Sequence, residues 1–516
     1  MIPANLYTTN SKEAAMEKKQ KTNKLKITAC ISVTLLVIIV VLWLLQCLLM
    51  PKYMSEIKEG ALISEYYNET TSHDVIFVGD CEVYENISPI TLWTEYGITS
   101  YIRGSAQQLI WQSYYILEDT FNHEKPDIVI YNVQSMIYGQ PQSEAYNRMT
   151  LDGLKMSSSK INAIKASMTE DESFLSYIFP IFRYHSRWSD LSKEDIKYIF
   201  DKDVISHNGY LMQTAVRPME SLPAVKPLED YTLPSISFEY LDKMAKLCKD
   251  NGAELVLVKS PSLYPHWYQE WDLQVAEYAK NNNLTYRNFI KESDEIGIDM
   301  QTDTYDMGMH LNVYGAEKYT SYLGKFLTEK YAGSDIFNHS QEKTLNEIWA
   351  NKVKEYQEDK KQSEGISVPD INIKPNDKYN EHPHNGFYFN ASEVKIGVNC
   401  GAWLVEEIKK SGLEYSYYEA QSCAYQGMDM FYTFDSFEVM VNTVDGHNVI
   451  TTISILDDLV KTAEGLKIGD SFERLTELYG NDYTVNGNIY KFTKDGTALS
   501  ILIKNNKVNS IEYIID

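Results

Sequence analysis

The sequence contains few prolines, few cysteines and few basic residues for its length. It has 15 prolines and six cysteines in 516 residues, and no two cysteines form a CxxC pair. This is neither the composition of a low-complexity protein nor the ligand spacing of a zinc site. Lysine and arginine total 48 against 72 aspartates and glutamates, a formal net charge of −24. Binding nucleic acid needs clustered basic residues, so we expect no nucleic-acid partner. We also expect no metal ion and no cofactor.

The cysteines follow no disulfide-framework spacing. Cys248 falls in a predicted helix, whereas Cys400 and Cys423 both lie in the C-terminal region. These two could form a disulfide with each other. The sequence leaves this open, because a disulfide depends on how far apart two residues lie in space.

One long apolar segment lies near the N-terminus. Residues 27–50 (ITACISVTLLVIIVVLWLLQCLLM) carry no charge over 24 positions, which at about 1.5 Å per residue is enough to cross a hydrocarbon core of roughly 30 Å. The segment after it is much less basic than the one before it. The positive-inside rule therefore predicts that residues 1–26 are cytoplasmic and that the main domains are extracellular. The preceding basic residues are Lys18, Lys19, Lys21, Lys24 and Lys26.

A cleaved signal peptide fits this segment less well, because the apolar run is too long and no small-x-small cleavage site follows it. A lipoprotein signal also fits poorly, since Gln46 before Cys47 is bulkier than the usual small residue. We expect an uncleaved, single-pass anchor in the cell membrane. The sequence has no second comparable segment, which argues against a channel or a transporter.

Downstream of the anchor, strand and helix patterns alternate over residues 60–333. Short apolar runs of the buried-strand kind alternate with segments of helical spacing. This order predicts an α/β domain with a parallel sheet covered on both faces. The expected strands are 74–80, 127–133, 254–260 and 284–290, and the expected helices are 106–122, 238–250, 268–281 and 315–331.

Two segments depart from this alternation. Residues 139–234 are polar and rich in helix signals, and FPIFRYHSRW (179–188) is their most distinctive part. We interpret them as an insertion that either caps the site or adds a packing layer. Residues 334–385 are charged and helical, which is typical of a linker or spacer helix.

The last segment, 386–516, is a separate module. Short strands with turn signals at 445–446, 486–487 and 495–496, together with a helix within 464–480 capped by Asp470 or Ser471, predict an α+β fold. Its stretches QSCAYQGMDMFYTFDSFEVMV and KTAEGLKIGDSFERLTELYG resemble a small module of exported lipoproteins of Gram-positive gut bacteria. Since no polar constellation suggests chemistry there, we expect a binding or wall-facing module.

Four polar blocks follow predicted strands or precede predicted helices. Gly79-Asp80-Cys81 ends the first strand, Arg103-Gly104-Ser105 precedes a helix, Asn132 ends the second strand, and DMGMHLN (306–312) precedes the last helix. In parallel sheets, ligands bind at the carboxyl ends of the strands. We therefore expect these blocks to meet in one cleft.

At these residues the chain resembles the SGNH/GDSL hydrolase superfamily, over about residues 74–331. FVGDCEVY resembles the family's GDS block, RGSAQQ its glycine block, YNVQSM its asparagine block and HLNVYGAEKY its histidine block. The resemblance implies a flavodoxin-like three-layer fold. It also implies Cys81 as nucleophile, His310 as general base, and the Gly104 N–H and the Asn132 amide as oxyanion donors.

The sequence departs from the family at two positions. The family's nucleophile is serine, where this chain has Cys81. The family's aspartate usually stands three residues before the histidine, where this chain has Met307; Asp306 stands four before. We expect Asp306 to orient His310 if the loop bulges by one residue.

The same residues make chemical sense without the family. Acyl transfer needs a nucleophile activated by a base, and fixed donors aimed at the developing oxyanion. Asp80 and Lys259 end strands at the same sheet edge and could contact substrate, Lys259 through an anionic group. Lys259 could equally be a surface lysine, and Cys81 could be an inert thiol that packs as a small hydrophobe.

These expectations lead to one function and two rivals. The first is an O-acyl, and most directly O-acetyl, transferase or esterase that acts on a cell-envelope polysaccharide through an acyl intermediate on Cys81, with a membrane protein as a possible acyl source. The second is a catalytically inactive, SGNH-like scaffold or binding protein of the envelope. The third is a thiol peptidase or thioesterase. Fold alone does not decide among them.

Overall fold

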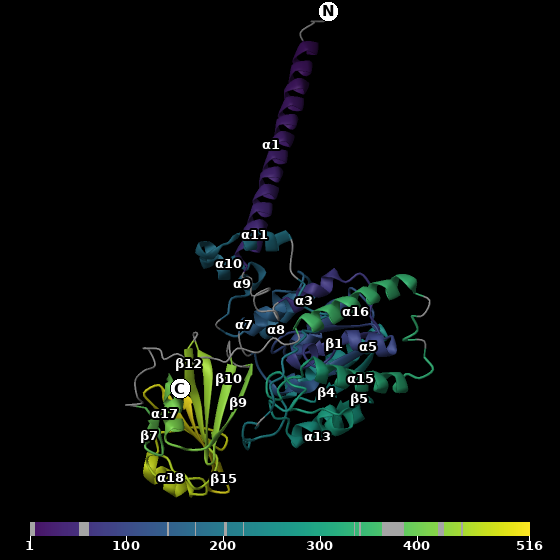
Figure 1. Ribbon diagram of the computed structural model, residues 1–516. Coiled ribbons are helices and arrows are strands. Elements are labelled where there is room, and N and C mark those ends of the chain that lie inside the picture. Colours follow the sequence, from purple (N-terminus) through teal and green to yellow (C-terminus); the bar gives the residue numbers. More distant parts are fainter. Residues whose placement is uncertain are drawn as a thin grey trace, which may run out of the picture. The chain divides into compact units, whose positions relative to one another are not determined.

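Figure 1 shows the protein as a computed structural model. The chain divides into two compact units, which we describe separately: a smaller one of Met1–Ile57 with Glu172–Val204, and a larger one of Lys58–Asp171 with Ile205–Asp516. The structure describes residues 6–50, 61–141, 144–170, 172–200, 204–219, 221–334, 336–339, 342–363, 386–421, 428–444 and 447–516.

The larger unit contains the predicted parallel sheet. Its order, β2-β1-β3-β4-β5, is that of flavodoxin-like sheets, and every pair is parallel. The α/β prediction is confirmed, with one strand, β2, that the sequence analysis did not predict. β1 is buried at all five positions, as expected for a strand covered on both faces. The strands are β1 (Val75–Gly79), β2 (Ser100–Gly104), β3 (Ile128–Asn132), β4 (Glu254–Lys259) and β5 (Thr285–Asn288).

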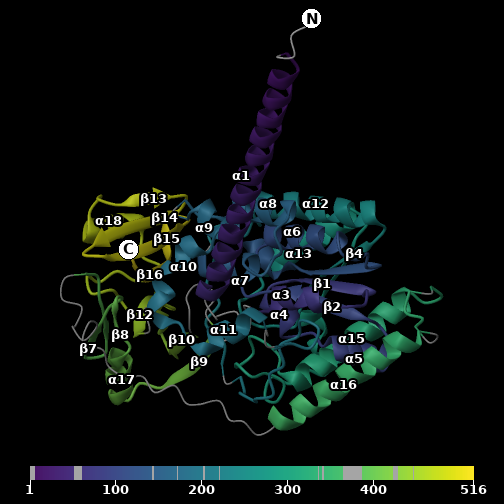
Figure 2. The ribbon, with the colours of Figure 1, turned by 90° about the horizontal axis from the view of Figure 1, so that it is seen from above.

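Helices cover both faces of this sheet (Figure 2). α6 (Ile110–Phe121) and α12 (Ser235–Asn251) pack together on one face, and α5 (Pro89–Tyr96) and α15 (Val313–Lys330) pack together on the other. The remaining helical segments of the α/β part are α3 (Leu62–Glu65), η2 (Tyr66–Asn68), α4 (Cys81–Tyr84), η3 (Val133–Ile137), α7 (Glu144–Leu151), α8 (Ser158–Ser167), α13 (Gln269–Asn281), η5 (Phe289–Glu292), α14 (Ser293–Ile296) and α16 (Lys343–Ser363).

The helix predicted at 106–122 begins later, at Ile110. Gln107 has a left-handed backbone (φ 52°), which no α-helix tolerates. The side chain of Gln112 accepts a hydrogen bond from the Leu109 N–H at 2.9 Å and so satisfies a donor of the first turn.

The insertion, 139–234, has several parts. α8 packs against α6 and so adds a layer outside the sheet. Further on, the chain runs beside the loop that precedes α15: the Arg217 N–H donates to the Thr304 carbonyl at 2.9 Å, and the Met307 N–H donates to the Arg217 carbonyl at 3.2 Å. One part therefore acts as a packing layer, and another borders the loop that carries the predicted histidine. Residues Glu172–Val204 belong to the smaller unit.

The helical part of the predicted linker, α16, packs onto the α/β domain. Leu345, Trp349 and Tyr356 lie along one buried face of it. The Trp349 ring stacks on Trp93 of α5, with centroids 5.1 Å apart. This apolar stripe gives α16 a place in the domain's core. Residues 364–385 lie outside the described part of the chain.

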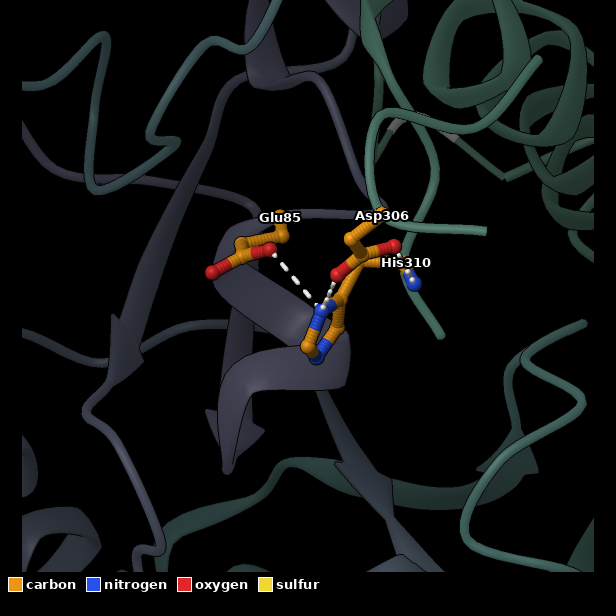
Figure 3. A group of neighbouring side chains, drawn as sticks. All are labelled: Glu85, Asp306 and His310. Atoms are coloured by element: carbon orange, nitrogen blue, oxygen red, sulfur yellow. Dashed lines mark hydrogen bonds and ion pairs between the residues drawn. The ribbon is translucent and has the colours of Figure 1, made fainter. Parts of the chain in front are cut away.

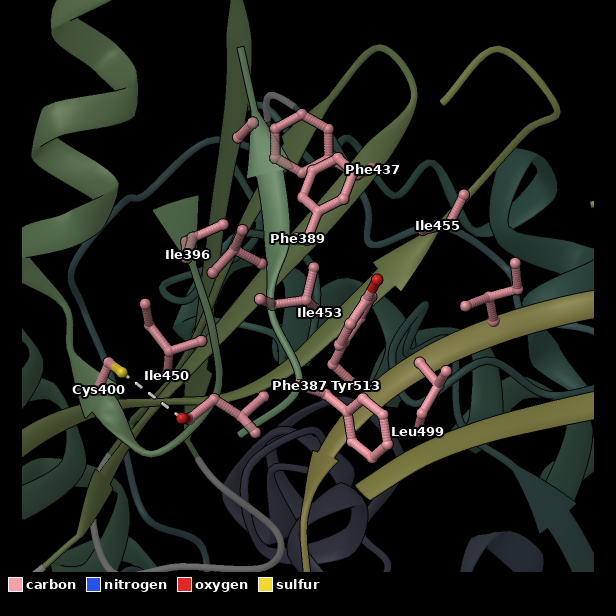
Figure 4. Close-up of a cluster of buried hydrophobic side chains, with 14 of the residues drawn as sticks. Phe387, Phe389, Ile396, Cys400, Phe437, Ile450, Ile453, Ile455, Leu499 and Tyr513 are labelled. Carbon is pink, nitrogen blue, oxygen red and sulfur yellow. Dashed lines mark hydrogen bonds between the residues drawn. The ribbon is translucent and has the colours of Figure 1, made fainter. Parts of the chain in front are cut away.

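The C-terminal module is a nine-stranded antiparallel sheet with two short helices over one hydrophobic core (Figure 4). The predicted helix is α18 (Phe472–Tyr479), whose first turn is capped by Ser471. The turn at 495–496 joins β14 to β15, as predicted. The other elements are β6 (Phe389–Ala391), β7 (Val394–Ile396), β8 (Cys400–Gly401), α17 (Trp403–Lys410), β9 (Tyr415–Gln421), β10 (Met428–Phe434), β11 (Phe437–Val444), β12 (His447–Ile455), β13 (Thr484–Asn486), β14 (Ile489–Lys494), β15 (Thr497–Lys504) and β16 (Lys507–Ile515).

Two predictions for this module fall on residues that the structure does not describe. The turn at 445–446 is one, and the Cys400–Cys423 disulfide is the other, because Cys423 lies outside the described residues. Cys400 is buried in the module's core, with its Sγ 3.5 Å from the Val398 carbonyl oxygen (Figure 4).

The smaller unit is built on one long helix, α1 (Leu6–Leu49). Within it, Asn23–Leu49 is long and apolar enough to cross a membrane. The described residues of Glu172–Val204 form short helical turns, of which α10, η4 and α11 contact α1. They are α9 (Phe174–Ile178), α10 (Ile181–Tyr184), η4 (His185–Asp190) and α11 (Lys193–Phe200).

Candidate active site

Cys81 is the first residue of a single helical turn at the carboxyl end of β1. Asp80 caps this turn: its carboxylate accepts a hydrogen bond from the Glu82 N–H at 3.1 Å. The Glu85 N–H closes the turn on the Cys81 carbonyl at 3.0 Å. Cys81 is partly exposed, whereas Asp80 is buried. Residues four apart share one side of a helix, so the side chains of Cys81 and Glu85 emerge on the same side.

His310 is held by Asp306 at the sheet edge that also carries Cys81. Its Nδ1 lies 2.7 Å from Asp306 Oδ2, and its backbone N–H donates to Asp306 Oδ1 at 2.8 Å. Both side chains are buried. In Figure 3 the second ring nitrogen, Nε2, points away from the carboxylates. The imidazole is thus oriented from one side, and Nε2 is left to meet a reacting group.

The loop accommodates its extra residue through two left-handed positions. Met307 has φ 64° and Gly308 has φ 101°, so the chain bulges between Asp306 and His310. The Thr304 hydroxyl braces this bulge: it accepts a hydrogen bond from the Gly308 N–H and lies within donating distance of the His310 carbonyl, both at 2.8 Å. The one-residue bulge expected from the sequence brings Asp306 to the imidazole.

A second carboxylate, which the sequence analysis missed, also reaches His310. Glu85 Oε2 lies 3.2 Å from His310 Nδ1 (Figure 3), and the Tyr305 hydroxyl donates to the same oxygen. The Tyr305 ring lies nearly parallel to the imidazole, with centroids 6.2 Å apart. Through Glu85, the turn that begins at Cys81 is in direct contact with His310. The available signal was the spacing in CEVYE, where a glutamate follows the cysteine by four.

The two carboxylates set the charge of the imidazole. Burial alone would lower the pKa of His310, but the charges of Glu85 and Asp306 outweigh burial and raise its pKa to about 9. His310 is therefore an imidazolium at neutral pH. Burial, aided by the charge of Glu82, raises the pKa of Asp80 to about 7, although Lys259 and His310 oppose the shift.

The Asn132 amide is engaged within the protein. Its Nδ2 donates to Glu82 Oε2 at 3.0 Å and to Ser260 Oγ at 2.8 Å. Its Oδ1 accepts a hydrogen bond from the Gln134 N–H at 2.9 Å. Asn132 therefore contacts Glu82 of the Cys81 turn, and both of its amide hydrogens are directed at protein oxygens.

Lys259 is buried inside the domain, which neither interpretation of the sequence predicted. Its side chain is fully buried, and its Nζ donates to Glu82 Oε1 at 2.6 Å and to the Ser260 carbonyl at 3.1 Å. The ammonium is neutralised inside the domain and does not line an open cleft. We therefore do not retain the substrate-binding role for Lys259, because a buried, paired cation has no free charge to offer an anionic group.

Gly104 ends β2 directly beside Gly79 of β1. A Cβ atom at position 104 would lie 2.6 Å from Val83 Cγ2 and 3.0 Å from the Gly79 carbonyl oxygen. Close packing of the Cys81 turn on β2 is thus sufficient to require a glycine. The backbone of Gly104 reaches the Cys81 turn, as an oxyanion donor must.

Among the described residues, Glu85, Asp306 and His310 form a group whose ligand atoms lie within 4.8 Å of one another. Such a set could in principle bind a metal ion. The 2.7 Å distance between His310 Nδ1 and Asp306 Oδ2 is, however, that of a direct hydrogen bond. Two ligands at about 2.0–2.2 Å from one tetrahedral ion lie farther apart than this. The geometry therefore fits a hydrogen-bonded pair rather than a metal centre.

The C-terminal module packs on the histidine loop. Met307 and Met309, which flank Gly308, form a small buried cluster with Tyr418 and Phe431 of the module. Glu419 forms an ion pair with Arg217 beside this cluster. Residues more than 100 positions downstream in the chain therefore help to fix the loop that carries His310.

Comparisons with known proteins add little to this description. No protein-family model matches the sequence, and no curated protein matches it. Among solved structures, a GDSL-like lipase from Bacteroides thetaiotaomicron aligns with 53% of this chain and 98% of its own, at 10% identity and a TM-score of 0.27. A similarity at this level supports no conclusion about function, which must come from the site itself.

Proposed function

We propose that this protein is a membrane-anchored, extracytoplasmic acyltransferase or esterase, which acts on O-acetyl or related O-acyl groups of a cell-envelope polysaccharide through an acyl intermediate on Cys81. In this proposal Asn23–Leu49 is the anchor, with the N-terminus in the cytoplasm. The resemblance of the sequence blocks to SGNH/GDSL hydrolases supports the reaction class. The substrate class is inferred from the proposed location.

The observation that carries the proposal is the hydrogen-bonded pair of His310 and Asp306 beside the Cys81 turn. A general base must be oriented, and the Asp306 contact at Nδ1 leaves Nε2 facing away. The Glu85 contact joins this pair to the turn that begins at Cys81. A nucleophile, a base and an orienting carboxylate on neighbouring segments are the requirements of acyl transfer.

The charge of His310 explains why cysteine suits this position. An imidazole with a pKa of about 9 is nearly as basic as an ordinary thiolate, for which the reference pKa is about 8.5. Because His310 is already protonated, the Cys81 proton leaves to solvent, and the positive charge of His310 stabilises the resulting thiolate–imidazolium pair. A serine hydroxyl is far less acidic than a thiol, so the positive charge of His310 would not be enough to ionise it near neutral pH.

The reaction then needs two steps. The Cys81 thiolate attacks the ester carbonyl; the tetrahedral oxyanion collapses, the C–O bond breaks, and the leaving alcohol takes the proton from His310. In the second step an acceptor hydroxyl, or water, gives its proton to His310 and attacks the thioester, which releases the Cys81 thiolate. The backbone N–H groups of Cys81 and Gly104 are the proposed oxyanion donors. A membrane protein that delivers acyl groups would supply the donor ester.

A non-catalytic envelope-binding protein is the second candidate, and one observation favours it. The Asn132 amide hydrogens are already directed at Glu82 and Ser260, so this side chain offers no free donor to an oxyanion. If the two backbone donors are not sufficient to stabilise the oxyanion, the domain serves as a scaffold without catalytic activity.

Thiol reactivity separates the two candidates. The full chain, reconstituted in lipid nanodiscs, is treated with limiting iodoacetamide, and alkylation of each cysteine is followed by peptide mass spectrometry. Burial raises the pKa of Cys248 to about 12, so this thiol is the internal control. The proposal predicts that Cys81 reacts at least tenfold faster than Cys248, and that His310→Gln removes most of the advantage. Equal rates, or rates indifferent to His310→Gln, would support the scaffold.

A further inference from the structure

We infer that residues 172–200, termed here the interface segment, lie in the headgroup region of the leaflet from which α1 emerges. The segment would thus be a second membrane contact of the protein. This inference rests on the proposed anchoring by α1 and is independent of any chemistry at Cys81.

The first observation is a change in exposure along α1. Ile39 and Trp43 are 62% and 55% exposed, whereas Leu49, at the end of the helix, is 4% exposed. Three helical turns of the interface segment, α10, η4 and α11, contact α1, and Arg187 of η4 binds the Leu49 carbonyl. The segment is therefore attached to the end of the span and leaves most of the apolar helix uncovered.

Arg187 fixes this attachment. Its Nη1 donates to the Leu49 carbonyl at 3.0 Å and also to the Met50 carbonyl, and its Nη2 pairs with Asp195 of α11 at 3.2 Å. The last carbonyls of a helix have no partner within the helix. Arg187 satisfies two carbonyls at this end and links them to α11, which gives the segment a defined position on α1.

The second observation is a group of exposed apolar side chains on the same short helices. In a soluble protein, large apolar side chains that gather in this way mark an interaction surface. Two of the aromatic rings, Phe179 and Phe182, also contact each other edge to face. The group consists of Leu175 (55% exposed), Phe179 (47%), Phe182 (62%), Trp188 (65%) and Ile196 (56%).

This group belongs to a segment that is attached to the end of α1, and this position points to the bilayer as its partner. The span ends at Leu49, so the boundary between hydrocarbon and water lies where Arg187 binds. Aromatic residues with neighbouring arginine and lysine are typical of that boundary. Residues 174–200 contain four basic and three acidic side chains. Binding would therefore depend on burial of apolar side chains rather than on anionic lipid.

The connectivity gives the segment a structural role. The chain passes between the two units three times, after Ile57, Asp171 and Val204. If the interface segment lies on the membrane, the larger unit is tied to the surface by three connections instead of one.

Site-specific photo-crosslinking tests the inference in the full chain, reconstituted in phosphatidylcholine nanodiscs. p-Benzoylphenylalanine replaces Phe182 or Trp188, and lipid adducts are identified by mass spectrometry. Leu273 of α13, 58% exposed, is the matched control on the larger unit. Val37, inside the span and 55% exposed, reports on the anchor. We expect lipid adducts at positions 182, 188 and 37, with at least tenfold less at 273.

Two outcomes would overturn the inference, and they are distinguishable from failure of the anchor. Adducts at 37 without adducts at 182 and 188 would show that α1 spans the bilayer while the interface segment does not touch it. Crosslinks from 182 to another protein chain would identify the surface as a protein interface. Absence of lipid adducts at 37 would refute the anchor itself, and the inference with it. Replacing half of the lipid with phosphatidylglycerol should change adduct yields at 182 less than twofold.

Discussion

His310 Nδ1 lies 2.7 Å from Asp306 Oδ2, and the His310 backbone N–H donates to the other oxygen of the same carboxylate at 2.8 Å. One side chain thus fixes both the loop and the ring it carries. Glu85, 3.2 Å from the same nitrogen, adds charge from the Cys81 turn. Asp306 therefore supplies orientation and charge, whereas Glu85 supplies charge from the Cys81 turn, and mutation of each can separate the two effects.

Asp306→Asn should reduce acyl transfer by about 10²- to 10⁴-fold, because an amide holds the imidazole in the wrong tautomer. Glu85→Gln should reduce the rate less than about tenfold, but should move the upper limb of the pH–rate profile to lower pH, since it removes a charge that raises the pKa of His310. The measurement is hydrolysis of a chromogenic acetyl ester between pH 5 and 10. An upper limb that does not move would show that Glu85 does not set the pKa of His310.

Cys81→Ser should lower the same rate by at least about 10²-fold, because a protonated His310 cannot act as a base for serine, and a hydroxyl, unlike a thiol, does not ionise beside a positive charge near neutral pH. Cys248→Ala, which alters a buried thiol in α12, should leave the rate within about twofold of the original. Retention of activity by the serine variant would contradict the thiolate–imidazolium interpretation.

Stability should depend on pH through His310 and Asp80. The folded pKa of His310 is raised to about 9, so its contribution is fully present below about pH 6.5 and is lost as the pH rises through 9; it amounts to about 3 kcal/mol. The folded pKa of Asp80 is raised to about 7, so its contribution is present below about pH 4 and is lost as the pH rises through 7. In denaturant unfolding, His310→Gln should remove the loss in the free energy of unfolding between about pH 6.5 and 9. Asp80→Asn should remove the loss between about pH 4 and 7. Unchanged curves would refute these assignments.

Replacing one member of the buried Lys259–Glu82 pair should destabilise the protein more than replacing both. Lys259→Met leaves the Glu82 charge without its cation and should cost about 3–5 kcal/mol. The double variant Lys259→Met, Glu82→Gln should recover at least half of that loss, as measured by urea unfolding. If the single variant is as stable as the original protein, the ion pair at 2.6 Å is not what holds this part of the domain.

Phe431→Ala should affect catalysis as well as stability, because Phe431 packs on Met307 and Met309 beside His310. Phe492→Ala is the matched control: Phe492 is equally buried but belongs to the module's own core. Each substitution should destabilise the protein by about 3–5 kcal/mol. Only Phe431→Ala should lower kcat, by at least about tenfold under conditions where both variants are folded. Equal kcat values would show that the module does not position the loop.

Much of the α/β fold could be predicted from the sequence, because buried parallel strands are continuous apolar runs and their helices have clear periodicity. β2 was missed, since SYIRG contains a buried arginine that pairs with Asp119 at 3.0 Å and does not look like a core strand. The packing of α16 was missed as well, because its charged residues conceal an apolar stripe around Trp349.

The candidate site was predictable where a strand end or a sequence motif places a residue, and not where a side chain depends on one particular contact with a distant segment. The pairing of Asp306 with His310 follows from a loop that bulges by one residue. The role of Glu85 depends on the turn that points it at His310, and the burial of Lys259 depends on Glu82, 177 positions away in the chain. No local pattern reveals such pairs, because the folded chain alone sets their distances.

The acylation state of Cys81 in cells shows whether this thiol carries an acyl intermediate. Protein taken from cells under acidic conditions, which slow thioester hydrolysis, would be digested, and the peptide that contains Cys81 analysed by mass spectrometry. We expect an acyl group on Cys81 that hydroxylamine removes and that is absent from His310→Gln protein. An unmodified Cys81 in both proteins, including after incubation with an activated acetyl ester, would contradict the proposed acyl intermediate.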